Sequence, residues 1–313
     1  MQQDLFGFDV KLDKDKGYQV LQKRLDNYEK DWCFQYDMRQ KLLQEDLFYS
    51  SLSLDETLSL KTSDFSFDIV KSEKEKQQCT CFIEKHEWLG TIAPFTTHWF
   101  VAKYKNLLAG VILFSEPYNR QVLFDDERYK DVERLISRGA CISWSPKNLA
   151  SMFLMWCIKW MVSNTHYRVF TAYSDPSAKE LGTIYQACNF YYLGNKFGKA
   201  TRYYHPFIKD KIVNSRAFRD VSMYKYAAFL LDVKWNESWA CGNTMKWDAI
   251  PQDIESKLRA KTIEIEHNAT QIPFPSKHKY AYVLGIDKRE TKALRCKFEK
   301  FNKIYEYPKE RGK

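Results

Sequence analysis

Several side chains able to bind anions or move protons lie between Arg138 and Gly194. Arg138 precedes the apolar run of residues 140–144, and its planar guanidinium can clamp a carboxylate or a phosphate. An internal salt bridge is the structural alternative for this arginine. Asp175 follows a second apolar run in the order Tyr-Ser-Asp-Pro, where ligands bind in open α/β sheets, but it could equally cap the next helix.

A second group, Lys147, Asn148 and Ser151, follows Pro146 at the expected start of a helix. Unpaired backbone N–H groups and the helix dipole favour an anion at such a position, and the ammonium, amide and hydroxyl groups can all reach it. Helix capping explains Asn148 without any ligand. The pattern therefore predicts either an anion site or an ordinary cap.

The elements that must position these residues follow from the apolar spacing. Residues 140–145 indicate a strand that ends at a proline, and residues 167–173 indicate a second strand. Apolar side chains recur at helical spacing over residues 149–160 and again over residues 178–188. The predicted unit is strand, helix, strand, helix, with the anion-suited junction after the first strand.

This order of elements resembles the GNAT acyltransferase fold, since a Tyr-x-x-x-x-Phe pattern, Tyr185 to Phe190, closes the second helix. Four segments in fixed order are similar to the Mom-type family of bacteriophage DNA-modification proteins: ISRGACISW, SPKNLASMFLMW, AYSDPSAKELGTIYQACNF and YYLG. About 57 of the 313 residues carry this resemblance. It implies a GNAT-like mixed central sheet flanked by helices, with a helical N-terminal and a basic C-terminal extension.

The resemblance also implies an enzyme that transfers an acyl-derived group to a DNA base, with adenine N6 as the expected target, and so protects phage DNA from restriction. Arg138 and the helix start near Lys147 would hold the donor, an acyl-CoA or another activated acyl or aminoacyl group. The family usually lacks a Gly-rich pyrophosphate loop at this helix start, and this chain lacks one too. The identity of the donor therefore stays open. A tyrosine placed like Tyr185 protonates the leaving group in this fold, and a pKa near 10 suits that role; a core aromatic is the alternative.

His86 and Glu87 lie in a segment that resembles an early His-aromatic element of the family, where His-His-Tyr lies near a proposed iron site. This chain has Lys85-His86-Glu87-Trp88 instead, without the second histidine or the tyrosine. We therefore predict no metal ligands here. His86 or Glu87 could instead take a proton from the exocyclic amine of a base, because imidazole and carboxylate groups act as general bases; a polar surface role is the alternative.

Charge and composition point to a polyanionic partner. The net charge is +9, and residues 276–313 hold twelve Lys or Arg against five Asp or Glu, a net charge of +7. Aromatic residues are interleaved with these cations, so we predict DNA contacts in this region, with a solvated tail as the alternative. The predicted DNA-binding residues are Lys277, Lys279, Lys288, Arg289, Lys292 and Arg295.

The remaining sequence features predict the domain boundaries and the cellular location. We predict a helical extension over residues 1–64, with helices over 18–47, a catalytic domain over 65–210, and a basic extension over 211–313. The chain shows no signal-peptide pattern and no membrane span, so we expect a soluble protein in the cytoplasm of an infected bacterial host. Two other functions remain open: an N-acyltransferase acting on a small amine, a protein or an aminoacyl-RNA, and a non-catalytic DNA-binding protein.

Overall fold

The computed structural model describes residues 33–117, 124, 131–196, 201–209 and 211–309. The chain divides into two compact units, each described separately below. The first, which we call the sheet unit, holds the described residues between 28 and 198 and between 276 and 313. The second, the small unit, holds those between 199 and 275. None of the described helices is long and apolar enough to cross a membrane.

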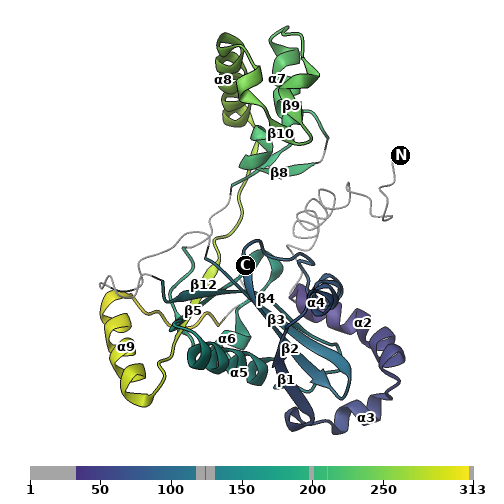
Figure 1. The fold of residues 1–313 in the computed structure, drawn as a ribbon, viewed down its shortest axis with the longest axis vertical. Coiled ribbons are helices and arrows are strands. Elements are labelled where there is room, and N and C mark those ends of the chain that lie inside the picture. Colours follow the sequence, from purple (N-terminus) through teal and green to yellow (C-terminus); the bar gives the residue numbers. More distant parts are fainter. Residues whose placement is uncertain (1–32, 118–123, 125–130, 197–200, 210, 310–313) are drawn as a thin grey trace. The chain divides into compact units, whose positions relative to one another are not determined.

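A seven-stranded sheet forms the centre of the sheet unit, in the order β1-β2-β3-β4-β5-β12-β6 (Figure 1). All neighbouring strands are antiparallel except β4 and β5, which are parallel, so the sheet is mixed. The strands are β1 (Phe65–Ile69), β2 (Thr96–Tyr104), β3 (Leu107–Ser115), β4 (Glu133–Cys141), β5 (Val169–Ser174), β6 (Tyr191–Tyr192) and β12 (His278–Val283).

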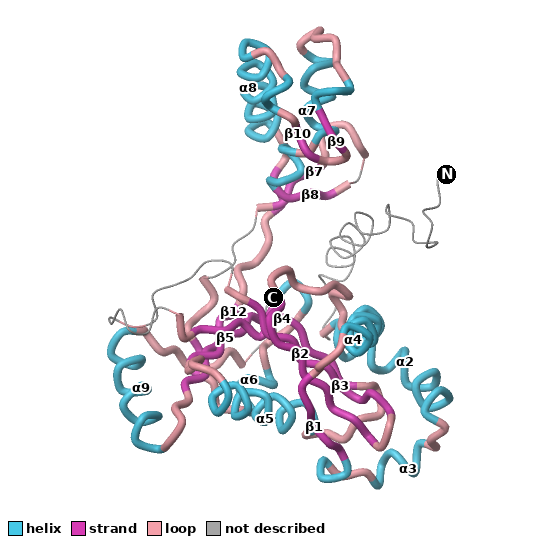
Figure 2. The backbone as a smooth tube through the Cα atoms, viewed as in Figure 1, coloured by secondary structure: helices cyan, strands magenta, loops and turns pink. Residues whose placement is uncertain are grey.

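Helices cover both faces of this sheet, because successive strand residues point to opposite sides. Phe100 and Ala102 of β2 pack with helix α5 (Leu149–Asn164) on one face. Val101, which lies between them in sequence, packs on the other face, with helix α4 (Glu73–His86). Helix α9 (Lys288–Phe301) covers the α4 side of β5 and β12. Figure 2 shows these helices as cyan coils around the magenta strands.

The remaining helices of the sheet unit are short or lie before the sheet. They are α2 (Phe34–Ser50), α3 (Leu54–Ser59), α6 (Thr183–Ala187) and two turns of 3₁₀ helix, η1 (Thr62–Asp64) and η3 (Pro176–Ala178). The start of α4 carries a capping box, in which Ser72 and Glu75 satisfy each other's backbone N–H groups. This cap fixes where α4 begins and hence where its last residue, His86, lies.

The small unit has its own apolar core, which includes Tyr203, Phe218, Tyr224 and Leu258. Its three-stranded sheet has the order β11-β7-β8, and two longer helices pack together beside it. Its elements are β7 (Arg202–Tyr204), β8 (Ile212–Asn214), η4 (Ser215–Arg219), α7 (Val221–Leu230), η5 (Glu237–Trp239), β9 (Ala240–Cys241), β10 (Thr244–Met245), η6 (Trp247–Ala249), α8 (Gln252–Asn268) and β11 (Gln271–Ile272).

The mixed α/β sheet flanked by helices that the sequence predicts is confirmed. The strand-helix-strand core appears as β4, α5 and β5. Of the helices expected over 18–47, α2 accounts for the described part, and residues 18–32 lie outside the described residues. The predicted domain boundaries at 64 and 210 remain predictions, although residues 278–283 of the expected basic extension form a central strand of the sheet.

Two local predictions are wrong. The helix expected over residues 178–188 is interrupted, because Lys179 and Gly182 have positive φ angles of 56° and 68°, and only α6 remains of it. Residues 117–137 are polar and charged, and their pattern predicts a helix in the second half of this segment. This prediction fails over the described part, since β4 begins at Glu133. Its residues pair with both β3 and β5, so strand pairing overrides the helical pattern.

We predict that Gly182→Ala lowers the melting temperature more than Gly242→Ala does. Both glycines have positive φ, 68° and 57°, so both alanines carry the same backbone strain. A Cβ at Gly182 would lie 2.5 Å from the Tyr280 ring, whereas nothing lies within 4 Å of a Cβ at Gly242. The steric term should add about 1–3 kcal/mol for Gly182→Ala. Equal losses in thermal denaturation of the two variants would contradict the packing of Tyr280 on this turn.

Candidate functional site

Strands β4 and β5 separate within the sheet. They pair from Glu133 opposite Val169 to Ile136 opposite Ala172, and no further. Beyond this point β4 pairs only with β3, while β5 pairs only with β12. Both strands run in the same direction, so the separation opens at their carboxyl ends, which is where open α/β sheets bind ligands.

On the β4 side, Arg138 is the second residue after the last paired position. Its Nε donates to the Thr91 carbonyl at 2.6 Å, and one terminal nitrogen donates to Thr91 Oγ1 at 3.1 Å. A further terminal nitrogen donates to the Ser137 carbonyl at 2.5 Å. The arginine therefore joins β4 to the loop that follows Glu87.

The helix start predicted to bind an anion comes next along the chain. Lys147 and Asn148 are exposed, and α5 begins at Leu149. Asn148 occupies the N-cap position, but its side chain makes no capping hydrogen bond. Ser151 donates from Oγ to the Asn148 carbonyl at 3.1 Å. The exposed ammonium and amide groups thus stand beside first-turn N–H groups that cannot have partners within the helix.

On the β5 side, three carboxyl groups influence one another electrostatically. Glu180 accepts from Trp88 Nε1 at 2.9 Å and from the Asp175 backbone N–H at 3.2 Å. Burial raises the pKa of the Glu180 carboxyl to about 7, and the charges of Glu87 and Asp175 act in the same direction. A carboxyl group with this pKa exchanges its proton near neutral pH, as a general base must.

Tyr185 lies on α6 beside these carboxyl groups. Burial, reinforced by the charges of Glu180 and Glu87, raises the pKa of the Tyr185 phenol well above its ordinary value. Its ring packs against Phe190 and Tyr280, with centroids 5.3 and 5.4 Å away. The phenol therefore keeps its proton and is both a packed aromatic and a hydrogen-bond donor.

Asp175 has two contacts that bear on its predicted role. Its Oδ1 accepts from the backbone N–H and the hydroxyl of Ser177, at 3.0 and 2.5 Å, so it caps η3 as the alternative interpretation required. Its Oδ2 lies 3.5 Å from the ammonium of Lys277. One of the predicted DNA-binding lysines is thus brought next to the carboxyl group.

Tyr280 of β12 holds the turn that carries Glu180. Its hydroxyl donates to the Leu181 carbonyl at 2.5 Å, and its ring lies over Gly182. Gln186 donates to the same carbonyl at 2.8 Å. Tyr280 therefore packs against the turn between Glu180 and Tyr185, although it follows them by about a hundred residues along the chain.

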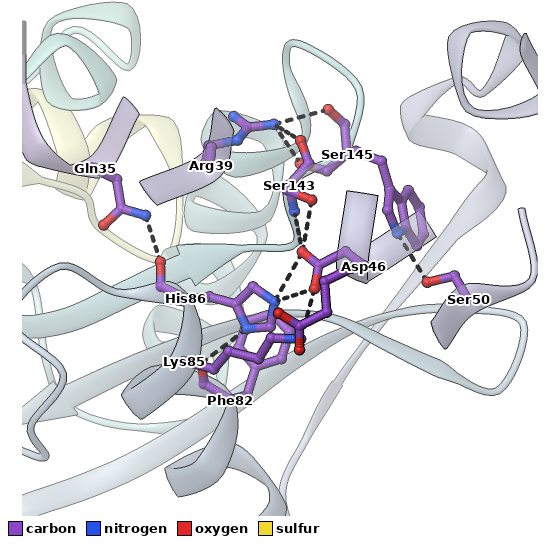
Figure 3. Close-up of polar contacts among 11 residues, drawn as sticks. Gln35, Arg39, Asp46, Ser50, Phe82, Lys85, His86, Ser143 and Ser145 are labelled. Atoms are coloured by element: carbon purple, nitrogen blue, oxygen red, sulfur yellow. Dashed lines mark hydrogen bonds and ion pairs between the residues drawn. The ribbon is translucent and has the colours of Figure 1, made fainter. Parts of the chain in front are cut away.

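A buried polar network lies beside the β4 end of the opening (Figure 3). Asp46 of α2 is 2% exposed and accepts from the backbone N–H and hydroxyl of Ser143, at 3.2 and 2.6 Å, and from Lys85 at 2.9 Å. Arg39 of the same helix donates to the carbonyls of Ser143 and Ser145, at 2.8 and 3.2 Å. Helix α2 thus fixes the segment between β4 and α5.

His86 belongs to this network rather than to the carboxyl group cluster. Nδ1 lies 3.1 Å from the Phe82 carbonyl, and Nε2 lies 3.1 Å from each carboxylate oxygen of Asp46. An imidazole between two acceptors donates to both only when both nitrogens carry protons, and then it has no lone pair for a substrate proton. Ser143 donates to Asp46 and not to His86, so these three residues are not a nucleophilic triad.

The predicted DNA-binding residues differ in exposure. Lys288, Arg289 and Lys292 are exposed on α9, whereas Arg295 is half-buried and donates from Nε to the Val283 carbonyl at 3.1 Å. Lys279 is only 1% exposed, because it faces the interior of the sheet between β5 and β6. Burial lowers the pKa of its ammonium. The interior position of Lys279 corrects its assignment as a phosphate contact.

The described residues do not fit the iron site that is implied by the resemblance of the segment around His86 to the family. None of their His, Cys, Asp and Glu side chains form a group of three that could hold a metal ion. The one histidine of that segment, His86, has both ring nitrogens engaged. No chemical step below uses iron.

The sequence model of the Mom protein family matches residues 68–309. The chain belongs to this family. No curated protein matches the Mom-family chain. Helix α2, which supplies Asp46 and Arg39, lies before the matched residues. The resemblance to the Mom family predicted from the sequence is therefore confirmed.

Several solved structures similar to this Mom-family protein are acetyltransferases. A GNAT family acetyltransferase from Elizabethkingia anophelis with acetyl-CoA bound is 10% identical, with a TM-score of 0.31, over 71% of this chain and 99% of that chain. A Bacillus subtilis acetyltransferase in complex with CoA is 9% identical, with a TM-score of 0.31, over 70% and 99%. An N-acetyltransferase from Staphylococcus aureus Mu50 is 18% identical, with a TM-score of 0.30, over 48% and 98%.

Sequence reasoning missed Asp46, Glu180 and Tyr280. Glu180 lies within the AYSDPSAKELGTIYQ segment, five residues after Asp175, and that proximity was the available signal. Asp46 and Tyr280 give no local signal, because each acts on residues about forty to a hundred positions away.

We predict that Asp46→Asn destabilises the sheet unit by about 1–3 kcal/mol at pH 7, since it replaces a buried carboxylate that accepts hydrogen bonds from Ser143 and Lys85. Burial raises the pKa of the Asp46 carboxyl, but hydrogen bonds from His86, Ser143 and Lys85 outweigh it and hold that pKa well below its usual range. Its stabilising effect is therefore present above pH about 4 and declines as the pH falls further. Denaturant unfolding of both proteins at pH 7 and pH 3 measures the difference, which should shrink at pH 3.

Asp37→Asn on the same helix is the matched control. Asp37 pairs with Lys41 at 2.6 Å on the surface, four residues apart, so its loss should cost at most about 0.5 kcal/mol. Similar losses for both variants at pH 7 would show that the Asp46 network adds nothing beyond a surface pair.

Proposed function

We propose that this protein transfers an acyl-derived group from an activated donor to an exocyclic amine of a DNA base, with adenine N6 as the target. The observation that carries the proposal is the separation of β4 and β5 between an anion-suited helix start and a cluster of carboxyl groups with a tyrosine. Membership of the Mom family supports DNA as the substrate. Modification of this kind would protect phage DNA from restriction.

The donor would enter on the β4 side. An acyl-CoA, or another activated acyl or aminoacyl group with a phosphate, would place that phosphate at the start of α5 beside Lys147 and Asn148. Ser143 and Ser145, held by Asp46 and Arg39, would keep this segment in place while the donor is bound. The reactive acyl carbon would then lie in the opening between the strands.

The chemistry follows from the β5 side. The exocyclic nitrogen attacks the acyl carbon, a C–N bond forms, and the bond from that carbon to the leaving group breaks. The amine proton passes to the Glu180 carboxylate, and Tyr185 donates a hydrogen bond and then its proton to the leaving atom. Glu87 and Asp175 raise the basicity of Glu180, and so make it a better base.

A base inside a duplex cannot reach this opening, so the enzyme must act on a base turned out of the stack. Exposed cations on α9, namely Lys288, Arg289 and Lys292, are suited to the phosphates that flank such a base. Lys277 connects the two features, because its ammonium lies 3.5 Å from Asp175. Its side chain is 37% exposed, which leaves it open to a phosphate as well.

Mass spectrometry of nucleosides tests the proposal. DNA from cells that express the protein should contain a modified deoxyadenosine that is absent from cells with the empty vector. Unaltered DNA together with consumption of acetyl-CoA in the purified reaction would instead indicate an N-acyltransferase acting on another amine. Unaltered DNA with tight DNA binding and no donor consumption would indicate a binding protein.

We predict that Tyr185→Phe folds normally and lowers the yield of modified nucleoside at least tenfold. The ring keeps its packing against Phe190 and Tyr280, while the transferable proton is lost. Tyr191→Phe is the control, since this tyrosine also lies in the sheet unit and its hydroxyl bonds to Glu299 on α9, away from the opening. Unchanged yield for Tyr185→Phe would remove its role as the acid.

We predict that the rate of DNA modification rises as the pH passes about 7. Glu180 must be ionised to accept a proton, and its pKa is raised to about 7. Glu180→Gln should lower the rate by about 10²–10⁴ and abolish this rise. Glu87→Gln removes a charge that raises the pKa of Glu180, so the rise should move to lower pH. A pH profile unaltered in both variants would assign the base elsewhere.

A further inference from the structure

The small unit carries a basic surface that the chemistry above does not use. Strands β7 and β8 form a hairpin, joined from Arg202 opposite Asn214 to Tyr204 opposite Ile212, and η4 follows directly. We call residues 201–219 the basic hairpin. They contain five Lys or Arg and one Asp, a net charge of +4 in nineteen residues.

The tip of the basic hairpin presents apolar side chains to solvent. Tyr204, Phe207 and Ile208 are 46%, 41% and 41% exposed. Two contacts stabilise the described residues of the tip. His205 donates its backbone N–H to the Lys211 carbonyl at 2.6 Å, and the Phe207 ring packs on the Tyr226 ring with centroids 4.4 Å apart. A fixed turn with exposed apolar groups can act as a wedge without large ordering losses.

Three cations of the basic hairpin differ from the cations of helices α7 and α8. Lys209, Arg216 and Arg219 are exposed, and none of them forms an ion pair with a described carboxylate. Arg216 and Arg219 are three residues apart on a 3₁₀ helix, which aligns their side chains along one side. By contrast, every Lys and Arg of α7 and α8 pairs with an acid: Lys225 with Glu237, Lys257 with Asp253, Arg259 with Glu255 and Lys261 with Glu264.

This contrast indicates which surface faces a polyanion. Cations paired with acids are already compensated, whereas cations without such partners gain most from phosphates. Exposed apolar and aromatic groups beside them suit the minor groove, where proteins insert apolar wedges between base steps. A protein partner would need acidic groups over the cations and an apolar pocket for Ile208, and nothing in the small unit indicates such a partner.

We propose that the basic hairpin binds duplex DNA, with Lys209, Lys211, Arg216 and Arg219 on the phosphates and the tip residues Phe207 and Ile208 in the minor groove. This inference rests on the proposed function, since it supplies a second DNA contact, in a different unit from the opening between β4 and β5. Insertion of the tip residues would kink the duplex, and a kinked duplex would lower the free-energy cost of turning a base out of the stack.

The test compares two variants of the full chain with equal charge loss. In the hairpin variant Lys209, Lys211, Arg216 and Arg219 become Ala. In the control the four cations that pair with acids, Lys225, Lys257, Arg259 and Lys261, become Ala. Affinity for a 20-base-pair duplex is measured from 50 to 300 mM KCl by fluorescence anisotropy. The slope of log affinity against log salt should flatten by about 0.9 for each lost phosphate contact in the hairpin variant, and remain near that of wild type in the control.

A third variant, Ile208→Ala, separates the tip from the cations. It should weaken DNA binding severalfold and leave the salt slope unchanged, because it removes an apolar contact and no charge. Circular dichroism confirms that each variant is folded, and Arg216→Gln with Arg219→Gln on η4 replaces the hairpin variant if that protein unfolds.

The outcomes distinguish this inference from the proposed function. Equal slopes for the hairpin variant and its control would overturn the inference, as would unchanged affinity in Ile208→Ala, while modified nucleosides in cells would still support the proposed function. A wild-type protein that binds no duplex at any salt and leaves DNA unmodified would overturn both.

Discussion

The short pairing between strands β4 and β5 is the constraint on which the rest of the sheet unit depends. Parallel strands in a sheet normally stay hydrogen-bonded along their length, yet these two share only the positions from Glu133 to Ile136. Beyond these positions β4 stays paired with β3, and β5 stays paired with β12, so both strands remain part of the sheet. The opening therefore lies inside the sheet, between β4, which leads to α5, and β5, which leads to the turn that carries Glu180.

Each side of this opening is fixed by an element remote in sequence. On the β4 side, Asp46 and Arg39 of α2 bind the backbone of the Ser143–Ser145 segment. Such a buried carboxylate is costly unless every oxygen accepts hydrogen bonds, and here His86, Ser143 and Lys85 supply them. Helix α2 lies before residue 68, where the match to the Mom family model begins, so these contacts come from outside the matched residues.

On the β5 side, the electrostatics and the packing act together. Tyr280 sets the turn through one hydrogen bond and one ring contact, and Gly182 is the residue that lets that ring approach. This turn brings Glu180 near two other carboxyl groups. Burial of Glu180 and the charges of those groups raise its pKa to about 7. A shift of this size depends on position more than on residue type, since an exposed glutamate has an ordinary pKa near 4.

The sequence by itself determined the features that depend on neighbouring residues. The apolar periodicity of α5 and β5 and the segments shared with the Mom family are local, and each was correctly predicted. The strand before α5 was predicted too far along the chain, over residues 140–145, since β4 ends at Cys141. Asp175 was found in the same way, at the end of β5, whereas Arg138 and Tyr185 were selected through the resemblance to the family. The roles given to all three remain predictions.

Only the tertiary structure decided which groups act together. The Phe82 carbonyl and the Asp46 carboxylate occupy the two ring nitrogens of His86, and the insertion of β12 between β5 and β6 buries Lys279, although both residues look free in the sequence. The raised pKa of Glu180 depends on its burial and on the charge of Glu87, and the Gly182 turn that ends the helix is packed by Tyr280. Glu87 and Tyr280 lie about ninety to a hundred residues from the groups they act on. Such contacts are set by strand order and packing, and a single sequence contains no local pattern that records them.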